Sequence, residues 1–211
     1  MDLVYFLRER VGFVRYFYGA TVSVFDETKR KIDEGEEPFA DWPPGEDSDT
    51  PAFAEEWGRA DFATNVIGLA CLGMLQSVFQ SFLKEHLTEM GGAKLLNQVS
   101  KMNKGNWFAN YRAFYNEKLG IDWASSGANL VLLEQMILAR NDFNHNLEIF
   151  GTFVYLTESH STKHPYTAFR DSAWPVSDVF PSPLKVEAGV LDSTIEAVDA
   201  LCEYLQRNSK R

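Results

Sequence analysis

Apolar residues recur at intervals of three and four along most of the chain, which is the period of an amphipathic helix. This spacing predicts a long helix over residues 3–32, with apolar positions at Tyr5, Phe6, Phe13, Tyr16, Phe17, Ala20, Val24 and Phe25. Glu34 and Gly35 end the pattern, and four prolines between positions 38 and 51 prevent its continuation. Residues 34–51 are therefore expected to form an acidic, proline-rich, solvated connector.

A second long helix is predicted over residues 53–88. Its 22 residues between Asp61 and Lys84 carry no charge, which is long enough to cross a bilayer. Six polar residues interrupt this stretch, so a central core helix is the better interpretation: Thr64, Asn65, Gln76, Ser77, Gln80 and Ser81. Small residues between positions 68 and 73 allow another backbone to approach, either inside the monomer or across a helix–helix dimer contact.

Shorter elements carrying both bases and aromatics follow the second helix. Residues 93–105 are expected to form a short helix or loop, and residues 107–119 a helix that Gly120 ends. Basic residues interleaved with exposed aromatics can bind phosphates and stack bases, so three bases are weak candidates for RNA binding: Lys101, Lys104 and Arg112. In the alternative interpretation, Trp107, Tyr111, Phe114 and Tyr115 are core residues and the bases are solvated.

The periodicity predicts two further helices. One runs from about 127 to 146, with Ser125 or Ser126 as its N-cap, and the other covers about 192–207 and is capped by Asp192. Between them, an irregular insertion at 147–189 contains two segments with the alternation of short strands, 152–156 and 184–188. The predicted fold class is a single, mainly α domain covering residues 1–211: an up-and-down bundle with two long N-terminal helices and a small β-ribbon near 152–188.

Composition and charge indicate which partners and which cellular environment to expect for the protein. The net charge is −10, but residues 33–61 hold eleven acids and one base, while the remainder holds equal numbers of each. The rest of the surface is therefore free to carry a basic patch, although the overall balance counts against tight nonspecific RNA binding. Two cysteines give no disulfide or metal framework, and Asp2, Arg8 and Arg10 interrupt the apolar N-terminus. A reducing, cytoplasmic setting is expected, with no membrane partner.

The candidate chemistry lies at the end of the 127–146 helix, where an apolar stripe runs on into polar residues. Asn141 and His145 are four residues apart and share one helix face. Arg140 is five residues before His145, so it points roughly 140° away from it on an ideal helix. Either the helix loosens near Asp142, or a second chain brings its own arginine and histidine alongside.

The pattern Arg140-Asn141-x-x-x-His145 resembles the R-x(4–6)-H signature of the HEPN superfamily, in which a polar residue often follows the arginine directly. The resemblance covers six residues in an all-helical context. It implies a HEPN-like bundle and a metal-independent endoribonuclease without a cofactor, in which Arg140 and His145 are catalytic at a homodimer interface. Asn141 and Asn144 would support them. Many members are toxins or antiphage effectors, so an antitoxin protein is an implied partner.

One position departs from this resemblance. Some HEPN toxins carry a tyrosine two residues after the histidine, where an antitoxin modifies it, and this chain has Leu147 there. Silencing through that tyrosine is therefore not carried over. Three other interpretations stay open: a noncatalytic HEPN-like module that binds a nucleotide, RNA or protein, a purely structural helical dimer, and an Arg140 that merely offsets the helix dipole.

The remaining histidines predict little chemistry. His160 and His164 have metal-like spacing, but they lie in a proline-flanked loop with no nearby cysteine and few acids. Zinc needs three or four ligands, so no metal site is predicted. His86 is expected to be a surface or capping residue on the second long helix.

Overall fold

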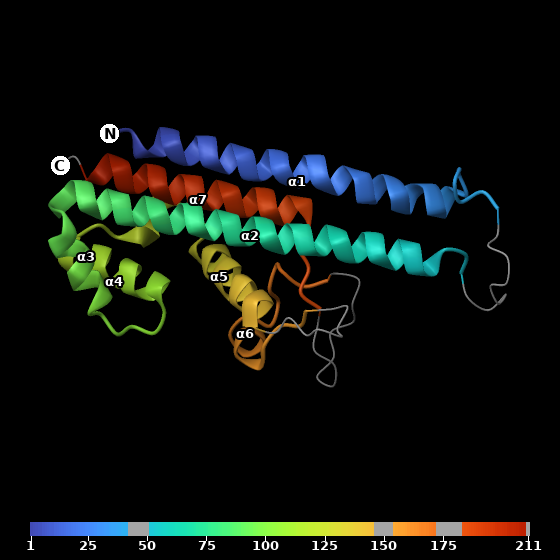
Figure 1. The fold of residues 1–211 in the computed structure, drawn as a ribbon. Helices are drawn as coiled ribbons and strands as arrows, with labels where there is room; N and C mark the ends of the chain where they lie inside the picture. The colour runs from blue at the N-terminus through green and yellow to red at the C-terminus, as the bar shows by residue number, and fades with distance from the viewer. Residues whose placement is uncertain (42–50, 146–153, 172–182, 210–211) are drawn as a thin grey trace.

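The computed structural model describes residues 1–41, 51–145, 154–171 and 183–209. Within these ranges the chain forms seven α-helices and one short 3-10 helix, so the prediction of a mainly α fold is confirmed. Two long helices, α1 (Leu3–Glu34) and α2 (Ala54–Gly91), run antiparallel and side by side. The C-terminal helix α7 (Ala188–Asn208) lies along both, and the shorter helices lie on the other side of α2 (Figure 1).

Helix α1 confirms the first predicted helix and extends it by two residues. The Asp2 carboxylate caps its start by accepting from the Tyr5 amide, and Gly35 ends it in the left-handed conformation at φ 64°. The buried face consists of Leu3, Val4, Leu7, Val11, Val14, Tyr18 and Val22. Most of the aromatics that set the sequence pattern lie outside this face and are exposed.

Helix α2 confirms the second predicted helix and is the centre of the core. Its fully buried residues include Cys71, Leu72, Leu75, Phe79, Leu83 and Leu87. In the part of the chain that the structure describes, α2 is the one helix long and apolar enough to cross a membrane, and half of its apolar window is buried inside the protein. Packing by α1, α3, α5 and α7 around it fits the predicted core helix.

The small residues of α2 between positions 68 and 73, here called its slim segment, differ in their surroundings. A Cβ on Gly68 would come within 2.7 Å of the Val186 Cβ, so close packing inside the chain requires glycine there. A Cβ on Gly73 would meet nothing within 4 Å. Tight packing within the monomer therefore explains why position 68 is glycine, but it does not explain why position 73 is glycine.

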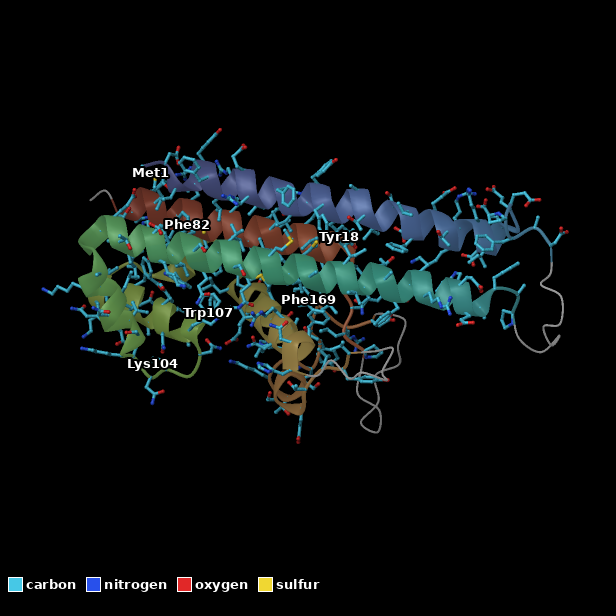
Figure 2. The ribbon with its side chains drawn as sticks, viewed as in Figure 1. Met1, Tyr18, Phe82, Lys104, Trp107 and Phe169 are labelled. Atoms are coloured by element: carbon cyan, nitrogen blue, oxygen red, sulfur yellow. The ribbon has the colours of Figure 1, made fainter. Side chains whose placement is uncertain are left out.

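Helices α3 (Ala93–Ser100) and α4 (Trp107–Leu119) and the 3-10 helix η1 (Trp123–Ser126) surround an aromatic cluster against α2. Gly120 ends α4 in the left-handed conformation, as predicted. Trp107 lies between α4 and α2, with its ring 6.0 Å from Phe79 (Figure 2). The core interpretation of the α4 aromatics is therefore correct, because Tyr111, Phe114 and Tyr115 are buried.

His86 contradicts its prediction as a surface residue. It is buried between α2 and α4, where its Nδ1 lies 2.7 Å from the hydroxyl of Tyr115. Desolvation lowers the pKa of His86, so the imidazole is held in its neutral form.

The starts of the last two long helices differ from the prediction. Helix α5 (Leu130–His145) is preceded by η1, and its N-cap is Asn129, whose side chain accepts from the Leu132 amide at 3.0 Å. Neither Ser125 nor Ser126 is the cap. Helix α7 begins at Ala188, so Asp192 lies inside the helix and binds Arg15 of α1 at 2.7 Å.

The insertion between α5 and α7 is partly described. Residues 152 and 153 of the first predicted strand lie outside the described residues, as does Asn146. In the described part there is no strand, only isolated bridges that join Tyr155 to Pro183 and Arg170 to Leu184. A short helix that was not predicted, α6 (Glu158–Lys163), follows Thr157 and packs on α5.

Candidate functional site around Arg140

Arg140 lies at the edge of a groove between α2 and α5. The groove has a volume of about 530 Å³ and is open to solvent, and its lining residues are Leu69, Ala70, Gly73, Met74, Ser77, Val78, Arg140, Phe143 and Asn144. Small residues of α2 form one wall and keep it low. The last turns of α5 form the other wall, which places a guanidinium beside an apolar floor.

Two amides hold the guanidinium. Arg140 Nη1 donates to Asn141 Oδ1 at 3.3 Å. With the Asn144 amide turned so that its oxygen faces Arg140, that oxygen accepts from Nε at 3.0 Å and from Nη2 at 3.1 Å. Among the residues that the structure describes, no carboxylate pairs with Arg140, and amides carry no charge. The positive charge is therefore oriented but not neutralised, which is what an anion-binding arginine requires.

His145 is the last described residue of α5 and is exposed. Its ring forms no hydrogen bond within the described ranges. The helix stays regular through His145, so it does not loosen near Asp142, and no contact joins His145 to Arg140. Within one chain the structure brings Arg140 together with Asn141 and Asn144, but not with His145.

A buried pair beside Arg140 was missed from the sequence. Asp142 is 4% exposed and His160 of α6 is fully buried, and their Oδ2 and Nδ1 atoms lie 2.7 Å apart. Thr157 adds two bonds to the same carboxylate, from its hydroxyl at 2.9 Å and from its backbone N–H at 3.2 Å. The only local signal was Thr157 followed by Glu158, a common helix start. The pair fastens α6 to the turn of α5 that carries Arg140.

Further contacts extend this attachment along α5. Lys163 and His164 approach the two carboxylate oxygens of Glu134 at 2.6 and 3.3 Å. The Gln135 side chain accepts from the Ala168 amide at 3.0 Å. His160 and His164 are thus engaged by single carboxylates, and the described ranges hold no cluster of three or more potential metal ligands.

The three bases proposed from the sequence lie elsewhere. Lys101, Lys104 and Arg112 are exposed on the α3–α4 unit, and none of them lines the Arg140 groove. Lys104 lies at the outer edge of that unit and forms an ion pair with Glu117 at 3.3 Å (Figure 2). The structure does not bring these bases together with Arg140 into one basic surface.

Comparison of the chain with protein-family models, with curated proteins and with solved structures found no match.

Proposed function

We propose that this protein is a metal-independent endoribonuclease in which Arg140 and His145 of two copies act together on one phosphodiester. The observation that carries the proposal is Arg140 itself: two neutral amides hold it at an open groove, and it has no carboxylate partner in the described part of the chain. A guanidinium in that state is available to an anionic ligand. The short resemblance to the HEPN signature supports the same assignment.

RNA supplies its own nucleophile, so the reaction reduces to proton transfer and charge stabilisation. The imidazole of His145 accepts the proton of the 2′-hydroxyl, and the 2′-oxygen forms a bond to phosphorus. The bond from phosphorus to the 5′-oxygen breaks, and that oxygen takes up a proton from a second imidazole. The products are a 2′,3′-cyclic phosphate and a 5′-hydroxyl. Arg140 binds the nonbridging oxygens, where negative charge develops in the transition state.

The geometry of α5 supports a site that two copies share. Arg140 faces the groove, whereas His145 lies five residues further along a regular helix and makes no contact with it. One histidine also cannot easily act as base and acid on opposite sides of an in-line displacement. A symmetric pair of chains supplies two arginines and two histidines. Asn141 and Asn144 then hold each guanidinium in position.

A noncatalytic function has one observation in its favour. The chain is strongly acidic, and the exposed bases Lys101, Lys104 and Arg112 lie away from the groove, so no extended basic track leads to Arg140. A HEPN-like helical module that binds a nucleotide, RNA or a protein through Arg140 needs no such track. A toxin or antiphage role, with an antitoxin as partner, depends on the resemblance alone.

Cleavage of labelled RNA in the presence of EDTA distinguishes these functions. We expect cleavage by the unmodified protein, and a loss of at least 100-fold in Arg140→Ala and in His145→Ala. Arg207→Ala, which removes an exposed arginine of α7 outside the groove, is the matched control and should retain activity. Cleavage that disappears with EDTA, or that survives both substitutions, would contradict the proposal. Binding without cleavage supports the module.

Mixing the unmodified protein with an inactive variant tests whether the site is shared. A mixed dimer of the unmodified protein with His145→Ala holds only one imidazole at the shared site, whereas the reaction needs a base and an acid. After random exchange of equal amounts of subunits, a quarter of the dimers keep both histidines, so the activity should fall to about half of that given by the same amount of unmodified protein alone. Unchanged activity after demonstrated exchange would mean that each chain holds a complete site.

A further inference from the structure

Helix α1 carries a second apolar stripe that the monomer does not use. Its members are spaced alternately by four and three residues, which is the spacing of a coiled-coil seam. They are Phe6, Arg10, Phe13, Phe17, Ala20 and Val24, here called the outer seam. Phe6 is 53%, Phe13 55% and Val24 62% exposed. The core face of α1 consists of other residues. Phe17 packs partly against the core cluster, but packing within the chain does not account for the exposed members of the outer seam.

The outer seam continues onto an open part of α2. Phe6 and Arg10 line a groove of about 550 Å³ together with Ser77 and Val78 of α2. The same two α2 residues also line the groove of Arg140. A continuous face therefore runs from the outer seam across the slim part of α2 to the candidate site. Gly73, which has open space above it, lies on this face.

The pattern of the outer seam fits a second copy of the same helix in antiparallel orientation. A twofold axis near residue 15 would place Phe6 opposite Val24, and Phe13 opposite Phe17. Arg10 would lie opposite Ala20, whose small side chain leaves room for the guanidinium. Large residues thus meet smaller or stacking partners along the seam. The rings of Phe13 and Phe17 already stack within one chain, with centroids 6.3 Å apart.

Charge along α1 also favours the antiparallel arrangement. The half from Leu3 to Arg15 carries three bases and one acid, whereas the half from Tyr16 to Glu34 carries three bases and four acids. Antiparallel pairing places the positive half of one copy beside the negative half of the other. Parallel pairing would place like beside like.

The exposed area of the outer seam is about half of what a standard interface needs. An aromatic side chain presents about 150–250 Å² in total, so half-exposed Phe6 and Phe13 offer roughly 100 Å² each. With Phe17, Ala20 and Val24 the outer seam offers about 400 Å², and a standard interface buries about 800 Å² on each partner. The groove that Phe6 and Arg10 share with Ser77 and Val78 of α2 adds further surface beside the seam.

We infer that the outer seam binds the outer seam of a second copy, forming a symmetric dimer with α1 antiparallel to α1. The inference adds to the proposed function the surface through which the two copies meet. The dimer itself is inferred from the outer seam, and only its role in RNA cleavage rests on the proposed function. The Arg140 groove opens at the margin of the same face.

Sedimentation equilibrium of the full chain at micromolar concentration tests the dimer. We expect the unmodified protein to be a dimer, and Phe13→Glu to raise its dissociation constant at least tenfold. Tyr5→Glu changes another exposed aromatic of α1, outside the seam, and should stay dimeric. Circular dichroism should show the same helix content in all three proteins, because neither residue belongs to the core. A monomeric unmodified protein, or equal effects of the two variants, would overturn the inference.

Cysteine pairs test the orientation. Mild oxidation of a mixture of Arg10→Cys and Ala20→Cys should give a heterodimeric crosslink, because the two positions oppose each other only in the antiparallel pair. Arg10→Cys alone should crosslink poorly, whereas a parallel pair would crosslink it efficiently and overturn the proposed orientation. Binding of the unmodified protein to anionic phospholipid vesicles, lost in Phe13→Glu, would assign the seam to a membrane surface instead.

These measurements separate this inference from the proposed function. A dimer that Phe13→Glu dissociates, but that cleaves no RNA, supports the outer seam and removes the ribonuclease. RNA cleavage by a dimer that Phe13→Glu leaves intact supports the ribonuclease and removes the outer seam as its interface.

Discussion

The residue with the most consequence for the candidate site, after Arg140, is Asp142. It is buried, accepts three hydrogen bonds from Thr157 and His160, and lies two positions from Arg140 on α5. A carboxylate removed from water is tolerated only when its partners replace the lost hydration. The segment from Thr157 to His160 supplies those partners. Buried hydrogen bonds of Asp142 thus attach the end of α5 to the segment 157–160, whereas Arg140 on the same turn faces the open groove.

This arrangement predicts a large effect at His160. The substitution His160→Phe fills a similar volume but leaves the Asp142 carboxylate without its closest partner. We expect a loss of about 3 kcal/mol in the free energy of unfolding, measured by urea denaturation, because removing one member of a buried pair leaves the other uncompensated. Hydrogen exchange should accelerate across residues 157–169.

Lys163→Ala provides the comparison. Like His160, Lys163 belongs to α6, and the substitution removes its ion pair with Glu134 of α5. The lysine is half exposed, so the loss should stay below about 1 kcal/mol. Equal losses in the two variants would mean that the Asp142–His160 pair does not fasten α6 to α5.

Of the candidate site, the sequence predicted the groups on α5 but not their attachment to the insertion. Arg140, Asn141 and Asn144 are close in sequence, so helical spacing alone brings them together. Asp142 and His160 are 18 residues apart on different helices. Their contact depends on how the insertion folds back, which no local pattern encodes.

At the scale of elements, helix boundaries that depend on local sequence were predicted, and those that depend on tertiary packing were not. Helices α1 and α4 end at Gly35 and Gly120, where a left-handed residue is required and glycine adopts it without strain. The predicted start of α5 was wrong because the sequence offers three good caps there: Ser125, Ser126 and Asn129. Only tertiary packing of η1 selects Asn129. Helix α6 is six residues long, which is too short for a periodic signal.

Helix α2 gives a matched pair of glycine substitutions. Gly68→Ala should lower the free energy of unfolding by about 1 kcal/mol or more, because its Cβ would overlap Val186, and overpacking outweighs the better helix propensity of alanine. Gly73→Ala should raise it by up to about 1 kcal/mol, since nothing surrounds that position in the monomer.

Both substitutions are best measured by thermal and urea unfolding in the Phe13→Glu background, so that self-association does not contribute. Shifts of the same sign in the two variants would contradict the distinction between an occupied and an open side of α2.

At the scale of the whole molecule, the two ends of the chain are joined. The Val4 amide of α1 donates to the side chain of Gln206 at 2.8 Å, and the guanidinium of Arg8 binds Asp199 at 2.7 Å. These contacts hold α7 along the α1–α2 pair, so helices from both ends of the sequence close the core (Figure 1). The sequence predicted the three helices, but not that α7 packs along both of the long ones, because each helix offers more than one apolar face.

The closed core contains a titratable group, His86, whose ionisation should affect global stability. Burial lowers the pKa of His86, and the Leu205 backbone and the Glu89 carboxylate only partly offset this shift. The unfolded chain, with an ordinary histidine pKa of about 6.5, therefore binds a proton before the folded protein does as the pH falls. The stability that neutral His86 contributes is present above about pH 6.5. It is lost as the pH falls from there towards the lower pKa of the folded state.

Urea unfolding between pH 7 and pH 5 should reveal this dependence. The unmodified protein should lose more stability over that range than His86→Asn, which cannot take up a proton there, because the folded state of the unmodified protein binds this proton less readily than the unfolded chain does. Parallel curves for the unmodified protein and His86→Asn would show that the core accepts a charged His86. The core would then contain a route for water or a carboxylate to reach the ring.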